Sequence, residues 1–231
     1  MAKKQFFLIV DTETTVKDTV ADFGAVVVDR KGAIHTQCAV LLRDHFDILE
    51  LFYTGETGFW GKSSAARRRE AYTKMLNEGS RMLASVAAVN RWLEKVSGKY
   101  APTLTAYNLP FDSDKCQRTG IDLNTFPTRF CLWAAASNTI CRSKAYRNFV
   151  LENHLFNNPT EKGNMTYKTD AESVAGYLAG QMVKEPHTAI EDAIHFELPI
   201  LTAILKRKAW RESIKPYDWK AFQVKSHFVA R

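Results

Sequence analysis

The stretch FFLIVDTETT at residues 6–15 decides how the chain begins its fold. Its five successive apolar residues, 6–10, are typical of a buried strand, and the acidic residues Asp11 and Glu13 follow them. Residues i and i+2 of a strand project from the same face, so we expect both carboxylates at one edge of the core. Like charges so placed repel each other by several kcal/mol, which indicates that a positive partner belongs there.

Two further strand-like runs follow, at residues 23–29 and 33–42. Arg30-Lys31-Gly32 joins them, and this short glycine-containing connection favours a β-hairpin. Next we expect a helix capped by Ser63 or Ser64, and then the elements that complete the chain: a helix at about 81–97, strands at 102–108 and 128–133, and helices near 143–155, 171–181 and 188–206. This order predicts an α/β protein whose antiparallel hairpin is followed by parallel strands.

The composition is that of a soluble globular protein, with 231 residues, 45% of them apolar and 25% charged. We find no apolar stretch long enough to span a membrane and no signal peptide, and the four cysteines are far apart. A cytoplasmic protein with reduced thiols is the simplest interpretation. The spacing of Cys131, Cys141 and His154 matches no zinc template. The net charge of +7 favours a polyanionic partner.

Asp112 has a setting similar to that of Asp11 and Glu13. It lies in AYNLPFDSD, just past the expected strand at 102–108 and at the start of an expected helix. Binding sites are built at this end of parallel strands. A single acid at a helix start is more often a helix cap. Asp112 is therefore a candidate site residue only because other acids are expected nearby.

The fourth acid, Asp192, lies in PHTAIEDAIHFELPIL, which begins at Pro186. Thr188 and Glu191 match a capping box, so we expect a helix to begin directly after Thr188. His187 then lies outside that helix and Asp192 at the end of its first turn. Inside one helix the two would be about 140° apart, whereas from these positions both can reach a single site. Pro199 should kink or shorten the helix.

Four converging carboxylates would repel one another strongly without cations. Ligation by oxygen alone suits Mg²⁺ or Mn²⁺, which also bind the phosphate oxygens of substrates. Two such ions can activate water and stabilise the leaving oxygen in phosphoryl transfer. A neutral His187 beside that water could accept its proton at physiological pH.

The three motifs DTET, YNLPFD and HTAIEDA, in this order, resemble the exonuclease motifs of the DEDD superfamily over roughly residues 6–205. The spacing of His187 and Asp192 is similar to that of the DEDDh branch, which includes proofreading exonuclease subunits, ribonuclease T and oligoribonuclease. Thr188 stands where the tyrosine branch needs Tyr. The resemblance implies a ribonuclease H-like fold, a mixed sheet flanked by helices, and 3′→5′ exonuclease activity that uses two metal ions. The resemblance is also compatible with a homodimer.

The resemblance also implies roles for individual residues. Asp11, Glu13 and Asp192 would bind the first metal, Asp11 would also bind the second, and Asp112 would act on the second largely through water. His187 would be the general base. The remaining implied contacts are with the 3′ end of single-stranded DNA or RNA, from which nucleoside 5′-monophosphates would be released: Thr12 and Thr14 beside the terminal nucleotide, and Asn108 and Phe111 near its sugar or base.

One stretch departs from the family pattern. Residues 43–79 are longer than the usual connection there, and their Phe59-Trp60 and Arg67-Arg68-Arg69 could stack a base and hold phosphates. A solvated helix with an aromatic anchor is the equal alternative.

We expect one exonuclease domain over residues 1–206, with residues 207–231 as its basic, aromatic C-terminal extension. A catalytically silent nucleic-acid-binding or interaction module on the same fold is the competing hypothesis, and a purely structural cation site ranks below it.

Overall fold

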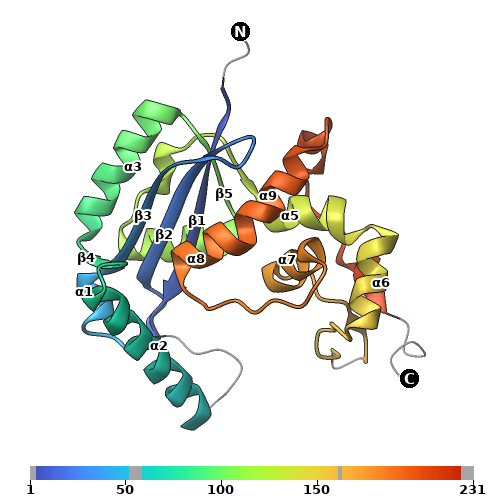
Figure 1. Ribbon diagram of the computed structural model, residues 1–231, viewed down its shortest axis with the longest axis horizontal. Coiled ribbons are helices and arrows are strands. Elements are labelled where there is room, and N and C mark those ends of the chain that lie inside the picture. Colours follow the sequence, from blue (N-terminus) through green and yellow to red (C-terminus); the bar gives the residue numbers. More distant parts are fainter. Residues whose placement is uncertain (1–3, 52–58, 161–162, 225–231) are drawn as a thin grey trace.

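A computed structural model describes residues 4–51, 59–160 and 163–224, apart from the side chains of residues 59–64. Its centre is a six-stranded sheet of order β4-β3-β2-β1-β5-β6 (Figure 1). The strands are β1 (Phe6–Thr14), β2 (Val20–Asp29), β3 (Ile34–Leu42), β4 (Met82–Ala84), β5 (Thr103–Ala106) and β6 (Arg129–Cys131). The first three strands pair in antiparallel fashion, and β4, β5 and β6 join in parallel. The expected α/β class is therefore confirmed, in an arrangement consistent with a ribonuclease H-like fold.

Helices cover both faces of this sheet. The helices are α1 (Arg43–Phe46), α2 (Phe59–Asn77), α3 (Val86–Tyr100), α4 (Leu109–Thr119), α5 (Leu132–Ala136), α6 (Lys144–Glu152), α7 (Ala171–Ala179), α8 (Ala189–Asp192) and α9 (Leu198–Leu205). Two π-helical segments, η2 (Ser137–Cys141) and η3 (Ala193–Glu197), follow α5 and α8. Short 3₁₀ turns occur at η1 (Leu123–Thr125), η4 (Trp210–Ser213) and η5 (Trp219–Phe222). In Figure 1, α8 and α9 cross one face of the sheet.

Side chains alternate along β1, so its residues pack into two separate hydrophobic cores, one on each face of the sheet. Phe7 and Ile9 pack on the side of α9 and the other C-terminal helices, whereas Leu8 and Val10 pack on the side of α3 and α4. Two covered faces explain why β1 reads as a continuous apolar run. By the same alternation, Asp11 and Glu13 belong to the face that α8 and α9 cover.

Two expected helix starts are wrong. Residues 81–97 do not form one helix, because Met82–Ala84 pairs with β3 as β4 before α3 begins at Val86. The cap of α3 is Ser85, whose side chain accepts a hydrogen bond from the Ala88 N–H. In α2 the expected caps Ser63 and Ser64 lie inside the helix, which begins earlier, at Phe59. The strand expected over 128–133 stops at Cys131, where α5 takes over.

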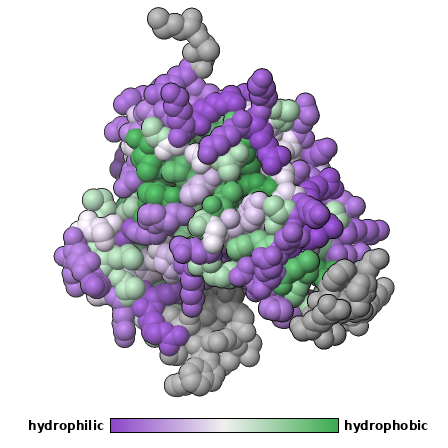
Figure 2. All heavy atoms as spheres, turned by 45° about the vertical axis from the view of Figure 1, so that its right-hand side comes forward, coloured by the Kyte–Doolittle hydropathy of each residue, from purple (hydrophilic) through white to green (hydrophobic). Residues whose placement is uncertain are grey.

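The described part of the C-terminal tail packs on the body. Trp210 and Phe222 are both 2% exposed and belong to the core on the α9 side. Strand β8 (Gln223–Val224) pairs with β7 (Met165–Thr166) in a second, two-stranded sheet. Figure 2 shows one face of the molecule, with apolar residues gathered toward its centre and hydrophilic residues around them. Among the described residues, no helix has the length and apolar character needed to cross a membrane.

Candidate active site

The first two acids are placed by the full length of β1. The strand continues through the motif, and its register sets Asp11 opposite Gly24 and Glu13 opposite Asp22 on β2. At Gly24 the sheet touches the start of α8: a Cβ there would lie 2.4 Å from the backbone carbonyl carbon of Ala189. Because glycine has no side chain, α8 can lie directly over the part of the sheet that carries Asp11.

The start of α8 is held by a residue far away in the sequence. Asp22 accepts a hydrogen bond from the Ala189 N–H at 2.9 Å and another from Arg81 Nε at 3.3 Å. The Arg81 guanidinium also binds Glu191. The expected start after Thr188 is thus confirmed, but the capping box is wrong: the Thr188 hydroxyl makes no cap hydrogen bond, and Glu191 pairs with Arg81 instead.

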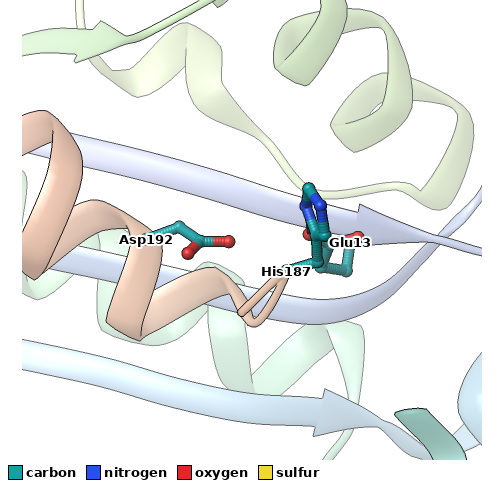
Figure 3. A group of neighbouring side chains, drawn as sticks. All are labelled: Glu13, His187 and Asp192. Carbon is teal, nitrogen blue, oxygen red and sulfur yellow. Dashed lines mark ion pairs between the residues drawn. The ribbon is translucent and has the colours of Figure 1, made fainter. Parts of the chain in front are cut away.

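Asp192 and His187 approach Glu13 from the two sides of that helix start. The Thr188 N–H donates to Asp192 Oδ2 at 3.0 Å, and His187 Nδ1 lies 3.9 Å from Glu13 Oε1. One possible ligand atom from each of Glu13, His187 and Asp192 lies within 4.8 Å of the other two. In Figure 3 the Asp192 carboxylate points toward the other two side chains. The predicted convergence of His187 and Asp192 is confirmed.

Asp112 joins from the neighbouring parallel strand. Only Tyr107 and Asn108 separate β5 from α4, and Asp112 lies in the first turn of α4, 4% exposed. The Thr12 hydroxyl of β1 donates to Asp112 Oδ1 at 2.8 Å, which ties the carboxyl to the acidic strand end. The alternative role as a helix cap does not apply, because the N-cap position of α4 is Asn108.

These side chains line one cavity of about 340 Å³. Eight of the nine predicted site residues line it: Asp11, Thr12, Glu13, Asn108, Phe111, Asp112, His187 and Asp192. The ninth, Thr14, lines an adjoining groove of about 690 Å³ instead, together with Arg67, Arg68 and Lys184. The structure also adds residues that the sequence did not single out for this cavity: Tyr107, Trp133, Asp170, Ala171, Glu185 and Glu197.

Burial makes this acidic cavity bind protons strongly. Loss of solvation and, to a smaller extent, neighbouring carboxylates raise the pKa of Glu13 and of Asp192 to about 8, and in Glu13 the Arg68 charge opposes this rise. Burial also raises the pKa of Asp112 to about 7 and holds that of Asp11 well above its usual value. The pKa of His187 is lowered, by burial first and by the nearby Arg68 charge second. His187 is therefore neutral at physiological pH.

The three arginines predicted to hold phosphates divide into two groups. Arg68 pairs with Glu13 Oε2 at 3.4 Å and, with Arg67, lines the groove beside the cavity. Arg69 instead donates to the Leu49 carbonyl at 2.6 Å and lies 4.6 Å from the centre of the Phe46 ring. Arg69 is thus a structural anchor of α2. The side chains of Phe59 and Trp60, proposed to stack a base, lie outside the described part of the structure.

The oxygen donors fit a divalent cation. Asp11 Oδ2 and Asp192 Oδ1 are buried and have no hydrogen-bond partner among the described residues. Buried, unpartnered carboxylate oxygens are costly, and Mg²⁺ or Mn²⁺ prefers oxygen donors of this kind. Asp11, Glu13 and Asp192, with Asp112 beside them, are the residues that would hold such ions. Within the described residues, Cys131, Cys141 and His154 form no such metal-ligating group.

The sequence matches no protein-family model and shows no significant similarity to a curated protein. The motifs, the fold and the geometry of the cavity therefore carry the functional argument.

Proposed function

We propose that the protein is a divalent-cation-dependent 3′→5′ exonuclease that acts on single-stranded nucleic acid and releases nucleoside 5′-monophosphates. One observation carries this proposal: acids from three separate motifs and the predicted base His187 line one cavity. The resemblance of the same motifs to the DEDDh branch supports it.

Different residues of the cavity would have different roles in the reaction. Bound Mg²⁺ or Mn²⁺ would supply a Lewis acid that stabilises the negative charge developing on phosphate oxygens. The carboxylates of Asp11, Glu13 and Asp192 would hold it in the cavity. His187, 55% exposed at its side chain and neutral, is available to accept the proton of an attacking water.

The adjoining groove supplies a route for the strand. It shares Thr12, Glu13, Phe111 and His187 with the cavity and adds the cationic side chains of Arg67, Arg68 and Lys184. Phosphates that leave the cavity would meet these cations, which suit a polyanionic backbone. Phe111 is 42% exposed between the two spaces, where an aromatic ring can stack on a base.

The test is digestion of 3′-labelled single-stranded DNA and RNA with Mg²⁺ or Mn²⁺. We expect cation-dependent release of labelled mononucleotides from at least one of the two. Asp11→Asn should lower the rate by more than the roughly 10–100-fold that losing an outer partner costs a metal site. Asp114→Asn is the matched control, because Asp114 lies two residues past Asp112 but is solvent-exposed and paired with Arg118.

Absence of release, or equal release by Asp11→Asn, would refute the exonuclease proposal. Tight binding of the oligonucleotide without cation-dependent turnover would favour the silent binding module instead.

A further inference from the structure

The helix that carries Asp192 changes its winding directly after that residue. Five residues of α-helix rotate a side chain by about 140°, which would point Glu197 away from Asp192. The chain instead forms the π segment η3 (Ala193–Glu197) between α8 and α9. Hydrogen bonds in a π-helix join residues five apart, so residues with this spacing lie one turn apart on one side. Pro199, in the first turn of α9, has no N–H for the preceding turn, a local reason for the change.

The π segment brings Glu197 to the cavity. Glu197 is 3% exposed and lines the same cavity as Asp11, Asp112 and Asp192. Its Oε1 accepts a hydrogen bond from the backbone N–H of Tyr107 at 2.9 Å, directly after the end of β5. Its Oε2 is buried and has no hydrogen-bond partner among the described residues. One oxygen is thus fixed, and the other is left for a ligand.

No cation of the described part of the protein neutralises this carboxylate. The buried or half-buried side chains of Arg68, Arg81 and Lys115 pair with other acids: Arg68 with Glu13, Arg81 with Asp22 and Glu191, and Lys115 with Asp18 and Asp114. A buried carboxylate without a cationic partner is a costly group for a fold to hold. Among the charged neighbours that raise the pKa of Asp11, Glu197 contributes the most, which places their charges close together.

We propose that Glu197 is a fifth carboxylate of the cation site and supplies its Oε2 as an oxygen donor. The inference rests on the proposed function for the presence of a divalent cation, but it does not require the hydrolysis itself. In the proposed site, the π segment η3 orients Asp192 and Glu197 toward the same ion.

The experiment is calorimetric titration of the full chain with Mn²⁺ alone, without nucleic acid. Glu197→Gln keeps the volume and the oxygen that accepts from the Tyr107 N–H but removes the charge and the second oxygen. We expect its Mn²⁺ affinity to fall by more than the roughly 10–100-fold that losing an outer partner costs a metal site. Glu197→Asp, which restores a carboxylate, should recover part of that loss. Glu94→Gln, on the exposed face of α3, is the matched control and should bind Mn²⁺ as the wild type does.

Thermal unfolding in EDTA separates a ligand role from a structural one. Glu197→Gln removes an acid that has no cationic partner in this cavity, so its melting temperature without cation should equal or exceed that of the wild type. Wild-type Mn²⁺ affinity in Glu197→Gln would overturn the inference, and so would a loss of stability in EDTA with the affinity unchanged.

The two proposals fail in different ways. Glu197-dependent Mn²⁺ binding without any release of nucleotides would refute the exonuclease and leave the fifth ligand standing. Cation-dependent nuclease activity whose Mn²⁺ requirement is the same in Glu197→Gln would refute the fifth ligand and leave the exonuclease standing.

Discussion

The backbone of His187 adopts a conformation that non-glycine residues rarely use. Its φ is 56°, in the left-handed region, and it directly precedes Thr188, the N-cap residue of α8. The Tyr72 hydroxyl donates to its carbonyl at 3.4 Å, and this contact helps to hold the turn. Strained residues of this kind concentrate at functional sites, because the surrounding structure must maintain them. The strained residue here is His187, the proposed general base, and its Nδ1 lies 3.9 Å from Glu13 Oε1.

The general-base role predicts a separation of rate from cation affinity. His187→Ala should lower turnover by about 10²–10⁴-fold, since that is the usual contribution of a positioned acid or base. Its Mn²⁺ affinity should match that of the wild type, because in the proposed site the acids alone hold the ion. Single-turnover digestion and Mn²⁺ titration measure the two quantities. His195→Ala, at an exposed position of η3, is the control. A loss of Mn²⁺ affinity as large as that of Glu13→Gln would make His187 a ligand instead.

Residue spacing predicted five of the acidic and basic side chains of the cavity but not Asp170, Glu185 or Glu197. The strand alternation of Asp11 and Glu13 and the helix start near Asp192 are local signals that the sequence displays directly. Glu197 needs a π turn to face the cavity, whereas regular α-helical periodicity directs it elsewhere. Winding defects depend on the packing of a whole segment, so spacing rules that assume regular helices miss them.

At the scale of elements, the contact between β2 and α8 fixes the distance between two of the motifs. Gly24 faces the backbone of Ala189 and Ile190, and both approach a position where any other residue would carry Cβ. Asp22 on the same strand caps the helix. A single strand therefore fixes both where α8 starts and how near it lies to Asp11.

Gly24→Ala should damage both the fold and the cation site. The new methyl group would lie 2.4 Å from backbone atoms that cannot rotate away, so α8 must shift. We expect a loss of about 1–3 kcal/mol in the free energy of unfolding, as for other overpacked cores, together with weaker Mn²⁺ binding. Urea unfolding in EDTA and Mn²⁺ titration test this. Gly98→Ala is the control, because nothing lies within 4 Å of its added Cβ. Equal stability of Gly24→Ala and the wild type would contradict the role given to this contact.

The arginines of α2 allow a paired prediction about nucleic-acid binding. Arg67→Gln should weaken binding of a single-stranded oligonucleotide and reduce the slope of log affinity against log salt by about 0.7 for each phosphate that the variant no longer neutralises. Arg69→Gln should instead lower the melting temperature, since Arg69 anchors α2 to Leu49 and Phe46. Fluorescence anisotropy over a salt series, with calcium in place of the active cation, measures the first effect. Equal salt slopes for Arg67→Gln and the wild type would exclude the groove as a phosphate path.

Sequence patterns could not predict β4 or the cap of α8, because both depend on contacts with residues far away in the sequence. The three residues of β4 become a strand only through parallel pairing with β3, and their apolar spacing merges with that of α3. The expected capping box at Thr188 failed for the same reason: Asp22, 167 positions away, provides the cap. Long runs such as β1 and the β2–β3 hairpin were predictable, since their signals are local.

At the scale of the whole molecule, the charge distribution is uneven. The chain carries a net charge of +7, yet the cavity that contains Asp11 and Asp192 is lined by acids, and Arg67 and Arg68 of α2 line the groove beside it. A basic molecule attracts polyanions, and an acidic cavity within it retains divalent cations. The two features act on different partners and are compatible in a cation-dependent nuclease.

The raised pKa values of these acids determine how stability depends on pH without a cation. Between about pH 4 and 8 the folded protein keeps protons on Glu13 and Asp192 that the unfolded chain has lost. The folded state thus binds more protons, and its stability must fall as pH rises through that window. His187 acts in the opposite direction, because its pKa is lowered, but only below its usual value of 6.5. Above pH 7 the carboxylates therefore dominate this part of the balance.

We expect the melting temperature in EDTA to decrease from pH 7 to pH 8.5, and Mn²⁺ to raise it more at pH 8.5 than at pH 6. The reason for the second effect is competition: at pH 6 the ion must displace protons from Glu13 and Asp192, whereas at pH 8.5 most of these protons have already dissociated. Scanning calorimetry at four pH values, with EDTA or Mn²⁺, measures both. Asp192→Asn removes one of the titrating groups, so it should flatten the decrease and reduce the effect of Mn²⁺. A melting temperature in EDTA that rises across this interval, or a Mn²⁺ effect independent of pH, would mean that the acids of the cavity do not control the stability of the fold.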